Sequence, residues 1–194
     1  VTGVQTCALP ILLGGPLYSS VGRAEAETPA NQRAQRKLVV RHLRELAAYA
    51  GDRGVTLCVE PLNRFETDLL NTCDQALDLV ADVGHPALKV HLDTFHMNIE
   101  EKDLGAAIRR CGQHLGLLHA SGSDRGTPGT DHIDWKGIAA ALRAIKFQGD
   151  VVIESFTQDV EIIARAAAIW RRIEPTQDEI AAKGAKFLRK LLKV

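Results

Sequence analysis

The chain has 194 residues, of which 45% are hydrophobic and 25% charged, and its 24 basic residues balance its 24 acidic ones. This length is enough for one folded core of ordinary size. The neutral balance disfavours nucleic acid and anionic membrane surfaces as partners, and no run is long and apolar enough to suggest a bilayer span. The four cysteines form no Cys-x-x-Cys pair, so disulfides are not implied and a reducing cytoplasm is the expected location.

The first ten residues, VTGVQTCALP, differ in character from the rest of the chain. They have no basic start, which makes a signal peptide a poor interpretation. They resemble a translated sequencing-adapter tract of the kind found at the ends of metagenomic fragments. We therefore expect residues 1–10 to be foreign to the fold and residues 11–194 to form a single domain.

The first predicted strand is ILLGGPLY, which ends in a Gly-Gly-Pro break. Thr28, as N-cap, and Pro29, at the first helical position, then open a helix that ends at Gly51 or Gly54. The run VTLCVE follows as the second strand. The apolar stripe predicted for the helix consists of Val39, Leu43, Leu46, Ala47 and Ala50.

The second predicted helix begins with Thr72 and Gln75, which have the spacing of a capping box, and it ends at Gly84. The third strand is LKVHLD. The acidic pair at 100–101 is expected to form the solvated start of a helix. A short helix over 104–111 and a fourth strand, LGLLHA, complete this part of the pattern.

The remaining pattern predicts two more units. Asp134 is expected to cap a helix that precedes the fifth strand, DVVIE. Thr176 and Glu179 have capping-box spacing and begin a final helix that ends at Leu192. Between this strand and this helix, one more helix is predicted from the spacing of Val160, Ile163, Ala167 and Trp170.

This alternation of strands and helices predicts a parallel sheet with helices outside it. Either an open doubly wound sheet or part of a barrel fits the pattern. Successive units are spaced at roughly 30 residues, the length of a strand with its return helix. A complete eightfold barrel needs about 250 residues. If the fold is a barrel, this chain therefore holds about five βα units and the first three are missing.

Four residues that can bind a metal stand at the ends of four of the strand-like runs: Glu60, Asp93, His119 and Glu154. The carboxyl ends of parallel strands lie on one face, so these side chains can converge. One such residue alone is more often a helix cap or an ion-pair partner. Two Glu, one Asp and one His together make a hard, mostly oxygen site that suits Mn²⁺ or Mg²⁺.

The sequence around each of these four residues is specific. The strings are VEPLNRFETDLLNT, HLDTFHMNIEE, HASGSDRGTPG and VVIESF, in this order and at this spacing. They resemble the ketose 3-epimerases, the D-tagatose and D-psicose 3-epimerase group of the xylose-isomerase-like barrel superfamily. The resemblance runs from about Ile11 to the end of the chain. It implies an α/β fold that corresponds to the fourth through eighth units of a (β/α)8 TIM barrel.

The resemblance also implies roles for particular residues. The four strand-end residues become the metal ligands, with Mn²⁺ as the expected ion and Co²⁺ or Mg²⁺ as alternatives. Glu60 and Glu154 become the acid/base pair that inverts C3 of a ketose through an enediolate. Glu66, His96 and Arg125 become contacts to the sugar hydroxyls, and relatives of this kind are expected to be dimers or tetramers. Two aromatic residues, Phe95 and Trp135, are weaker candidates for an apolar wall.

Other interpretations remain open at this stage. An aldose–ketose isomerase of the same superfamily would move a proton between C1 and C2. An inactive sugar- or metal-binding fragment is the non-enzymatic alternative. His91 lies two residues before Asp93 and is expected to point to the same side, either lining the barrel interior or as a structural residue. The sequence does not identify the ketose, although the lack of a phosphate-binding motif favours an unphosphorylated sugar.

Overall fold

The computed structural model describes residues 11–22, 28–156 and 158–193. The tract predicted to be foreign, residues 1–10, lies outside the described residues. One sheet contains five strands: β1 (Leu12–Gly15), β2 (Thr56–Val59), β3 (Leu88–Asp93), β4 (Leu115–His119) and β5 (Asp150–Val152). All neighbouring strands are parallel, and their order in the sheet is their order in the chain.

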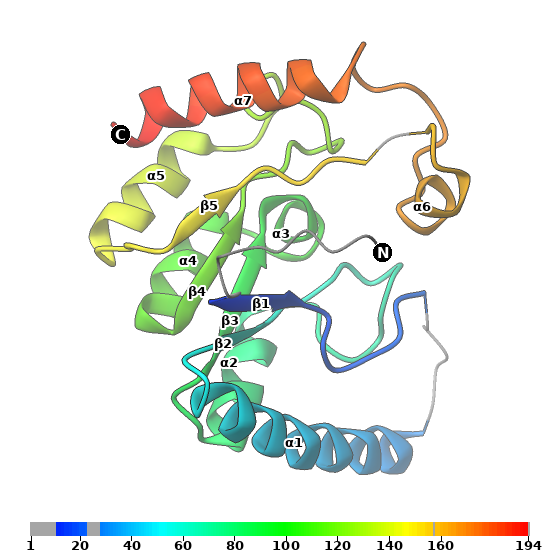
Figure 1. The fold of residues 1–194 in the computed structure, drawn as a ribbon, viewed down its shortest axis with the longest axis vertical. Helices are drawn as coiled ribbons and strands as arrows, with labels where there is room; N and C mark the ends of the chain where they lie inside the picture. The colour runs from blue at the N-terminus through cyan, green and yellow to red at the C-terminus, as the bar shows by residue number, and fades with distance from the viewer. Residues whose placement is uncertain (1–10, 23–27, 157, 194) are drawn as a thin grey trace.

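This strand order decides between the two predicted architectures. A doubly wound sheet reverses its strand order at a switch point, whereas a barrel adds each new strand beside the previous one. The sheet here adds strands in sequence from β1 to β5 and is curled, with helices on its outside (Figure 1). The fold is therefore an incomplete (β/α)8 barrel. Within the described residues, β1 and β5 each pair with a strand on one side only.

Seven α-helices and one 3₁₀ helix, η1 (Gly112–His114), occur in the described part of the chain. The helices that contact one another around the outside are α1, α2, α4, α5 and α7. The bounds of the α-helices are α1 (Pro29–Gly51), α2 (Cys73–Val83), α3 (Thr94–Glu100), α4 (Leu104–Cys111), α5 (Trp135–Ala144), α6 (Glu161–Ala166) and α7 (Gln177–Leu192).

The predicted helix starts are confirmed by side-chain caps. The Thr28 hydroxyl accepts a hydrogen bond from the Asn31 N–H, and Pro29 is the first residue of α1. Thr72 and Gln75 form both halves of a capping box on α2, which ends at the left-handed Gly84. These caps satisfy backbone groups that lack partners inside a helix, and each stabilises its helix by about 1 kcal/mol.

The region after β3 differs from the prediction. A helix, α3, begins directly at the strand end, because the Asp93 side chain caps it by accepting from the Phe95 N–H. The acidic pair was expected to start a helix, but Glu100 is the last residue of α3 and Glu101 follows it. Glu100 forms an ion pair with Arg64 at 2.9 Å, so this acidic residue links α3 to the loop after β2.

The predicted helix after β5 is also shorter than expected. Only Glu161–Ala166 is helical, and Ala168 adopts a left-handed conformation (φ 53°) that ends the helical path. Consequently Ile163 and Trp170 are exposed and do not form an apolar stripe.

The apolar stripe predicted on α1 is wrong at one position, Leu46, whose side chain is 50% exposed.

The core lies between the sheet and the outer helices. Three cysteines, Cys58, Cys73 and Cys111, are buried and free, while Cys7 lies outside the described residues. Burial raises the pKa of Cys58 to about 12, as expected for a thiol enclosed in the protein interior. Among the described residues no helix is long and apolar enough to cross a membrane.

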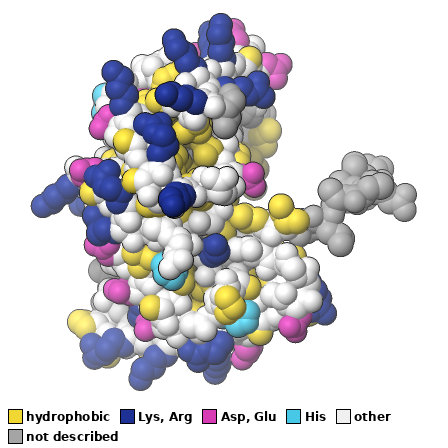
Figure 2. All heavy atoms as spheres, turned by 90° about the vertical axis from the view of Figure 1, so that its left-hand side faces the viewer, with side chains coloured by type: hydrophobic (Ala, Val, Ile, Leu, Met, Phe, Trp, Pro, Cys, Tyr) yellow, Lys and Arg dark blue, Asp and Glu magenta, His cyan; other side chains and the backbone are white. Residues whose placement is uncertain are grey.

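One side of the molecule is open between α5, β5 and α7. A cavity of about 1020 Å³ lies there, lined by apolar residues such as Phe147 and Leu188 and by basic residues such as Arg143 and Arg189. Figure 2 shows this side, where Lys and Arg side chains gather over the upper part of the face with apolar side chains between them.

Candidate metal centre

The parallel strands bring the four predicted ligands to one end of the sheet. Asp93 ends β3 and His119 ends β4, and the two are direct partners in the strand register. Glu60 follows β2, and Glu154 lies two residues after β5. Each side chain is therefore positioned by a strand rather than by a long loop, which fixes it well for binding a small ion.

The four residues belong to overlapping groups rather than to a single tight cluster. Nδ1 of His119 lies 3.8 Å from Oδ2 of Asp93 and 3.7 Å from Oε1 of Glu154, and these three offer ligand atoms within 4.8 Å of one another. Glu60 belongs to two further groups of this kind, one with Asp93 and His96 and one with His91 and His119.

Several buried polar atoms at this end lack a hydrogen-bond partner in the described part of the chain. Besides Nε of Arg125, which cannot bind a cation, they include Oε1 of Glu60, Nδ1 of His119 and both ring nitrogens of His91. A buried polar atom without a partner costs about 1–3 kcal/mol. A divalent cation would accept electron pairs from these atoms, and a set of carboxylates with imidazole matches Mn²⁺, Co²⁺ or Mg²⁺. The residues present therefore fit a bound divalent ion.

The electrostatics of the pocket support the same conclusion. Burial, followed by the nearby Asp93 and Glu154 carboxylates, raises the pKa of Glu60 well above its ordinary value. Burial also raises the pKa of Asp93 to about 6, although Arg125 acts in the opposite direction. Three carboxylates held in one buried region repel one another, and a divalent cation would relieve that repulsion.

Glu154 differs from Glu60 in its surroundings. Burial acts to raise its pKa, but His119 and Arg125 outweigh burial and lower the pKa to about 2. The Arg125 guanidinium forms an ion pair with Glu154 directly. The Glu154 side chain is 29% exposed, whereas that of Glu60 is 7% exposed. One glutamate is thus held as a carboxylate while the other favours its protonated form.

Arg125 is held rigidly at the centre of the site. Its backbone is left-handed (φ 62°), and its guanidinium carbon lies 4.1 Å from the centroid of the Phe95 ring and 4.7 Å from that of Phe156. Its Nη2 lies 3.2 Å from Nε2 of His96. Stacking between two aromatic rings orients the planar guanidinium, so its donors have fixed directions. The predicted wall residue Phe95 thus supports Arg125.

The other two predicted sugar contacts are linked by a residue that sequence reasoning missed, Asn63. Its backbone N–H donates to Nδ1 of His96 at 3.0 Å, and its side-chain amide donates to Oε1 of Glu66 at 2.9 Å. Nδ1 of His96 thus accepts from the backbone, while the guanidinium of Arg125, which can only donate, faces the other ring nitrogen, Nε2. Burial and then Arg125 lower the pKa of His96 to about 3, so the ring is neutral.

Further residues hold the ligands from behind. The Tyr18 hydroxyl donates to the backbone oxygen of Glu60 at 2.7 Å, and the Ser121 hydroxyl donates to Oδ2 of Asp93 at 3.3 Å. Tyr18 comes from the segment after β1, so this first unit braces the ligand on the second. The only sequence signal for these supporting residues is their position close after a strand end.

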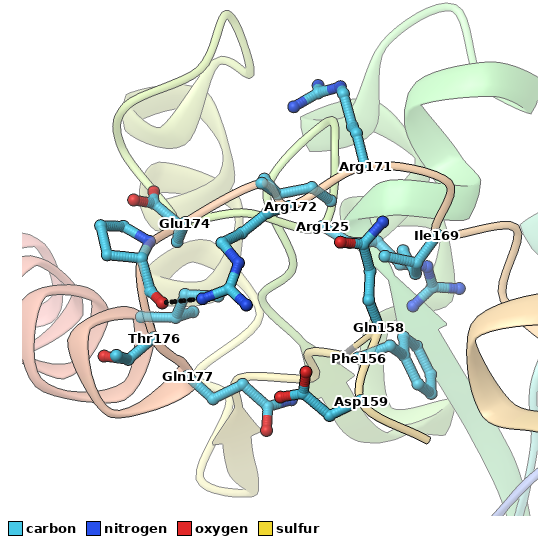
Figure 3. A pocket seen from close by; sticks show the side chains of 13 residues that line it. Arg125, Phe156, Gln158, Asp159, Ile169, Arg171, Arg172, Glu174, Thr176 and Gln177 are labelled. Carbon is cyan, nitrogen blue, oxygen red and sulfur yellow. Dashed lines mark hydrogen bonds between the residues drawn. The ribbon is translucent and has the colours of Figure 1, made fainter. Parts of the chain in front are cut away.

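Two cavities open beside Arg125. One, of about 640 Å³, lies between the loop after β2, α3 and the 165–173 segment, and it is lined by Glu66, Phe95 and Arg125 among others. The second, of about 180 Å³, is drawn in Figure 3 and is lined by basic Arg125, Arg171 and Arg172 and by acidic Asp159 and Glu174. Its mixed charges do not form a purely basic pocket.

Trp135 takes no part in this site. Its indole N–H donates to Oδ1 of Asp131 at 2.8 Å, and its ring meets that of Phe187 edge-on at 5.7 Å. It is 6% exposed and belongs to the core between α5 and α7, so the suggestion that it forms an apolar wall is wrong.

Comparison with known proteins gives consistent matches. Residues 6–191 match the family described as xylose isomerase-like TIM barrel. The D-psicose 3-epimerase of Enterocloster bolteae is 40% identical over 178 residues, which cover 90% of this chain and 59% of that protein. Among solved structures, one of L-ribulose 3-epimerase has a TM-score of 0.88 at 38% identity and covers 94% of this chain and 61% of its own.

A third match comes from a structure with a sugar. The D-psicose 3-epimerase of Clostridium cellulolyticum with D-tagatose has a TM-score of 0.86 at 37% identity, covering 93% of this chain and 64% of that one. The chain therefore spans about three fifths of the length of the relatives that it matches.

Proposed function

Since the chain belongs to the xylose isomerase-like TIM barrel family, we propose that it carries the metal-binding and proton-transfer residues of a ketose 3-epimerase. The observation that carries this proposal is the convergence of Glu60, Asp93, His119 and Glu154 at the carboxyl ends of four neighbouring strands. The relatives named as ketose 3-epimerases, which match across most of the chain, support the same reaction.

Inversion at C3 requires two proton-transfer groups, because a proton must leave one face of the carbon and another must arrive on the opposite face. In our proposal Glu60 and Glu154 are these groups. Their surroundings separate their pKa values in opposite directions, which is the arrangement expected of an acid and a base that act together. A divalent ion, when bound, supplies Lewis-acid polarisation of the ketone and its neighbouring hydroxyl.

The other residues orient the sugar in this proposal. Arg125 presents fixed guanidinium donors, and Asn63 fixes the orientation of the neutral His96 ring beside it. Glu66, held by the same Asn63, offers acceptor oxygens to hydroxyl groups. Glu66 and Arg125 also line the 640 Å³ cavity together, so we propose that this cavity gives the sugar access to the residues that bind it.

We propose an unphosphorylated ketose as the substrate, because the sequence carries no phosphate-binding motif. We further propose Mn²⁺ as the ion, because carboxylates are the majority of the donors. A cytoplasmic location and assembly into dimers or tetramers stay predictions of the sequence.

The experiment is proton exchange in D₂O. The 194-residue chain is incubated with Mn²⁺ and D-fructose, and NMR follows deuterium in the sugar. We expect deuterium at C3 together with the C3 epimer. Replacing Glu154 with Gln should slow this exchange by about 10²–10⁴-fold, the usual contribution of a general acid or base.

The matched control is Glu45→Gln on the exposed face of α1, which should leave the exchange rate unchanged. Deuterium at C1 or C2 only would replace our proposal with an aldose–ketose isomerase. Unaltered exchange in Glu154→Gln would remove this residue from the proton-transfer pair.

A further inference from the structure

We propose that His91 is an additional nitrogen ligand at this metal centre, so that the ion is bound by two imidazoles together with the carboxylates. The inference rests on the proposed function, because it adds a donor to the same site. His91 lies on β3 two residues before Asp93. Side chains two residues apart on a strand point to the same face, so both point toward the inside of the curled sheet.

The geometry places His91 within reach of two of the other ligands. Its Nδ1 lies 3.4 Å from Oε2 of Glu60, and its ring centroid lies 4.0 Å from that of His119, with the planes at 73°. Glu60, His91 and His119 each offer a ligand atom, and these atoms lie within 4.8 Å of one another. Two atoms that share one ion through bonds of about 2.0–2.2 Å lie at most about 4.4 Å apart, so only small side-chain movements are needed to bring this group into range.

The ordinary alternative is a structural histidine in the core, but this does not explain its surroundings. His91 is 1% exposed, and neither ring nitrogen has a hydrogen-bond partner within the described ranges. Buried side-chain polar atoms in native proteins are normally hydrogen-bonded. Glu60 and His119, which belong to the same candidate group, each have an unpartnered buried atom as well. A shared cation would bind one atom of each of the three side chains.

The neighbouring strand leaves space for this imidazole. A Cβ atom added at Gly14 on β1 would lie 3.3 Å from Nδ1 of His91 and 3.0 Å from Cδ2 of Leu117. Both contacts are closer than ordinary van der Waals separation. Glycine at position 14 therefore lets His91 occupy the interior beside Glu60, and an alanine there would press directly on its ligating nitrogen.

A second imidazole changes which ion the site prefers. Carboxylates suit Mn²⁺ and Mg²⁺, whereas imidazole donors favour later ions such as Co²⁺ and Ni²⁺. With His91 as a ligand, the ratio of Co²⁺ affinity to Mn²⁺ affinity should be higher than a single-imidazole site would give. This ratio is the quantity that separates a ligand from a residue that only fills space.

The test is calorimetric titration of the 194-residue chain with Co²⁺ and with Mn²⁺. His91→Leu keeps a similar buried volume, and it should weaken Co²⁺ binding by about tenfold or more, since even outer partners of metal ligands act on this scale. Mn²⁺ binding should weaken less. Gly14→Ala should shift the ratio in the same direction while retaining the imidazole. The control, His114→Leu on the exposed face of η1, should leave both affinities unchanged.

The coordinated imidazoles can also be counted by NMR in the wild-type chain. In proton NMR of the Co²⁺-loaded chain, each coordinated imidazole with a free ring N–H gives a strongly shifted exchangeable signal. We expect at least two such signals, one of which disappears in His91→Leu. If His91→Leu changes neither the ratio of Co²⁺ affinity to Mn²⁺ affinity nor the NMR spectrum, His91 is not a ligand. That result would leave the proposed function intact. Failure of the chain to bind either ion would overturn both.

Discussion

His91 should make the metal-free protein sensitive to acid. Burial, followed by repulsion from His119, lowers its pKa from 6.5 to about 2. The unfolded chain takes up a proton near pH 6.5, whereas the folded protein does not do so until the pH is near 2. The free energy of unfolding must therefore fall as the pH drops below 6.5, and it recovers as the pH rises through the same value.

The magnitude follows from this interval. Each pH unit between the two pKa values changes the free energy of unfolding by about 1.4 kcal/mol. Between pH 7 and pH 5 His91 should therefore remove about 2 kcal/mol of stability from the wild-type chain. His91→Leu lacks the titrating group and should not suffer this loss. At pH 7 the variant should be more stable than the metal-free wild type, because leucine has a similar volume and removes two buried ring nitrogens that lack partners.

The assay is urea unfolding with EDTA present at pH 7 and pH 5, followed by the fluorescence of the buried Trp135. The wild-type chain should lose about 2 kcal/mol more than His91→Leu. The pKa of His96, lowered to about 3, causes a similar loss in both proteins and cancels in the comparison. The His114→Leu control should behave as wild type. An equal loss in the wild type and in His91→Leu would refute the reasoning.

Three further predictions concern other parts of the molecule. Arg125→Met should slow C3 exchange by about 10²–10³-fold, because it removes the oriented charge beside Glu154; a rate within threefold of wild type would contradict this. Thr72→Ala removes the α2 cap and should cost about 1 kcal/mol in urea unfolding, whereas Thr72→Ser should restore most of it. The apolar residues Leu13 and Val152 are exposed on the outermost strands, so replacing both with Lys should reduce self-association in sedimentation experiments; unchanged sedimentation would show that these edges do not associate.

The strand pattern was predictable because buried parallel strands carry their own signal. Short runs rich in Val and Leu, each followed by a capped helix, indicated all five strands and the end of the sheet where Glu60, Asp93 and His119 meet. The period of the apolar residues depends only on local geometry. Side chains placed directly by a strand end could therefore be assigned to one face before the structure was known.

Features that depend on contacts between units were not predictable. The helix α3 lacks a loop before it, so no turn signal separates it from β3, and Asp93 serves as strand end and helix cap together. The apolar spacing through Ile163 and Trp170 indicated a helix, but the left-handed Ala168 ends it early. Asn63 reads as an ordinary loop residue until its bonds to Glu66 and His96 are seen.

The contrast between Glu60 and Glu154 shows why chemistry is harder to predict than position. Both follow an apolar strand, so the sequence presents them as equivalent. Glu60 is enclosed beside Asp93 and His91, and its pKa rises because burial and the neighbouring carboxylates outweigh the opposing effect of Arg125. Glu154 lies nearer the surface against Arg125, and its pKa falls. Because Arg125 reaches Glu154 from the loop after β4, a neighbouring unit sets this difference. A division of acid and base roles is thus a property of adjacent units packed together, which no single strand and its loop can encode.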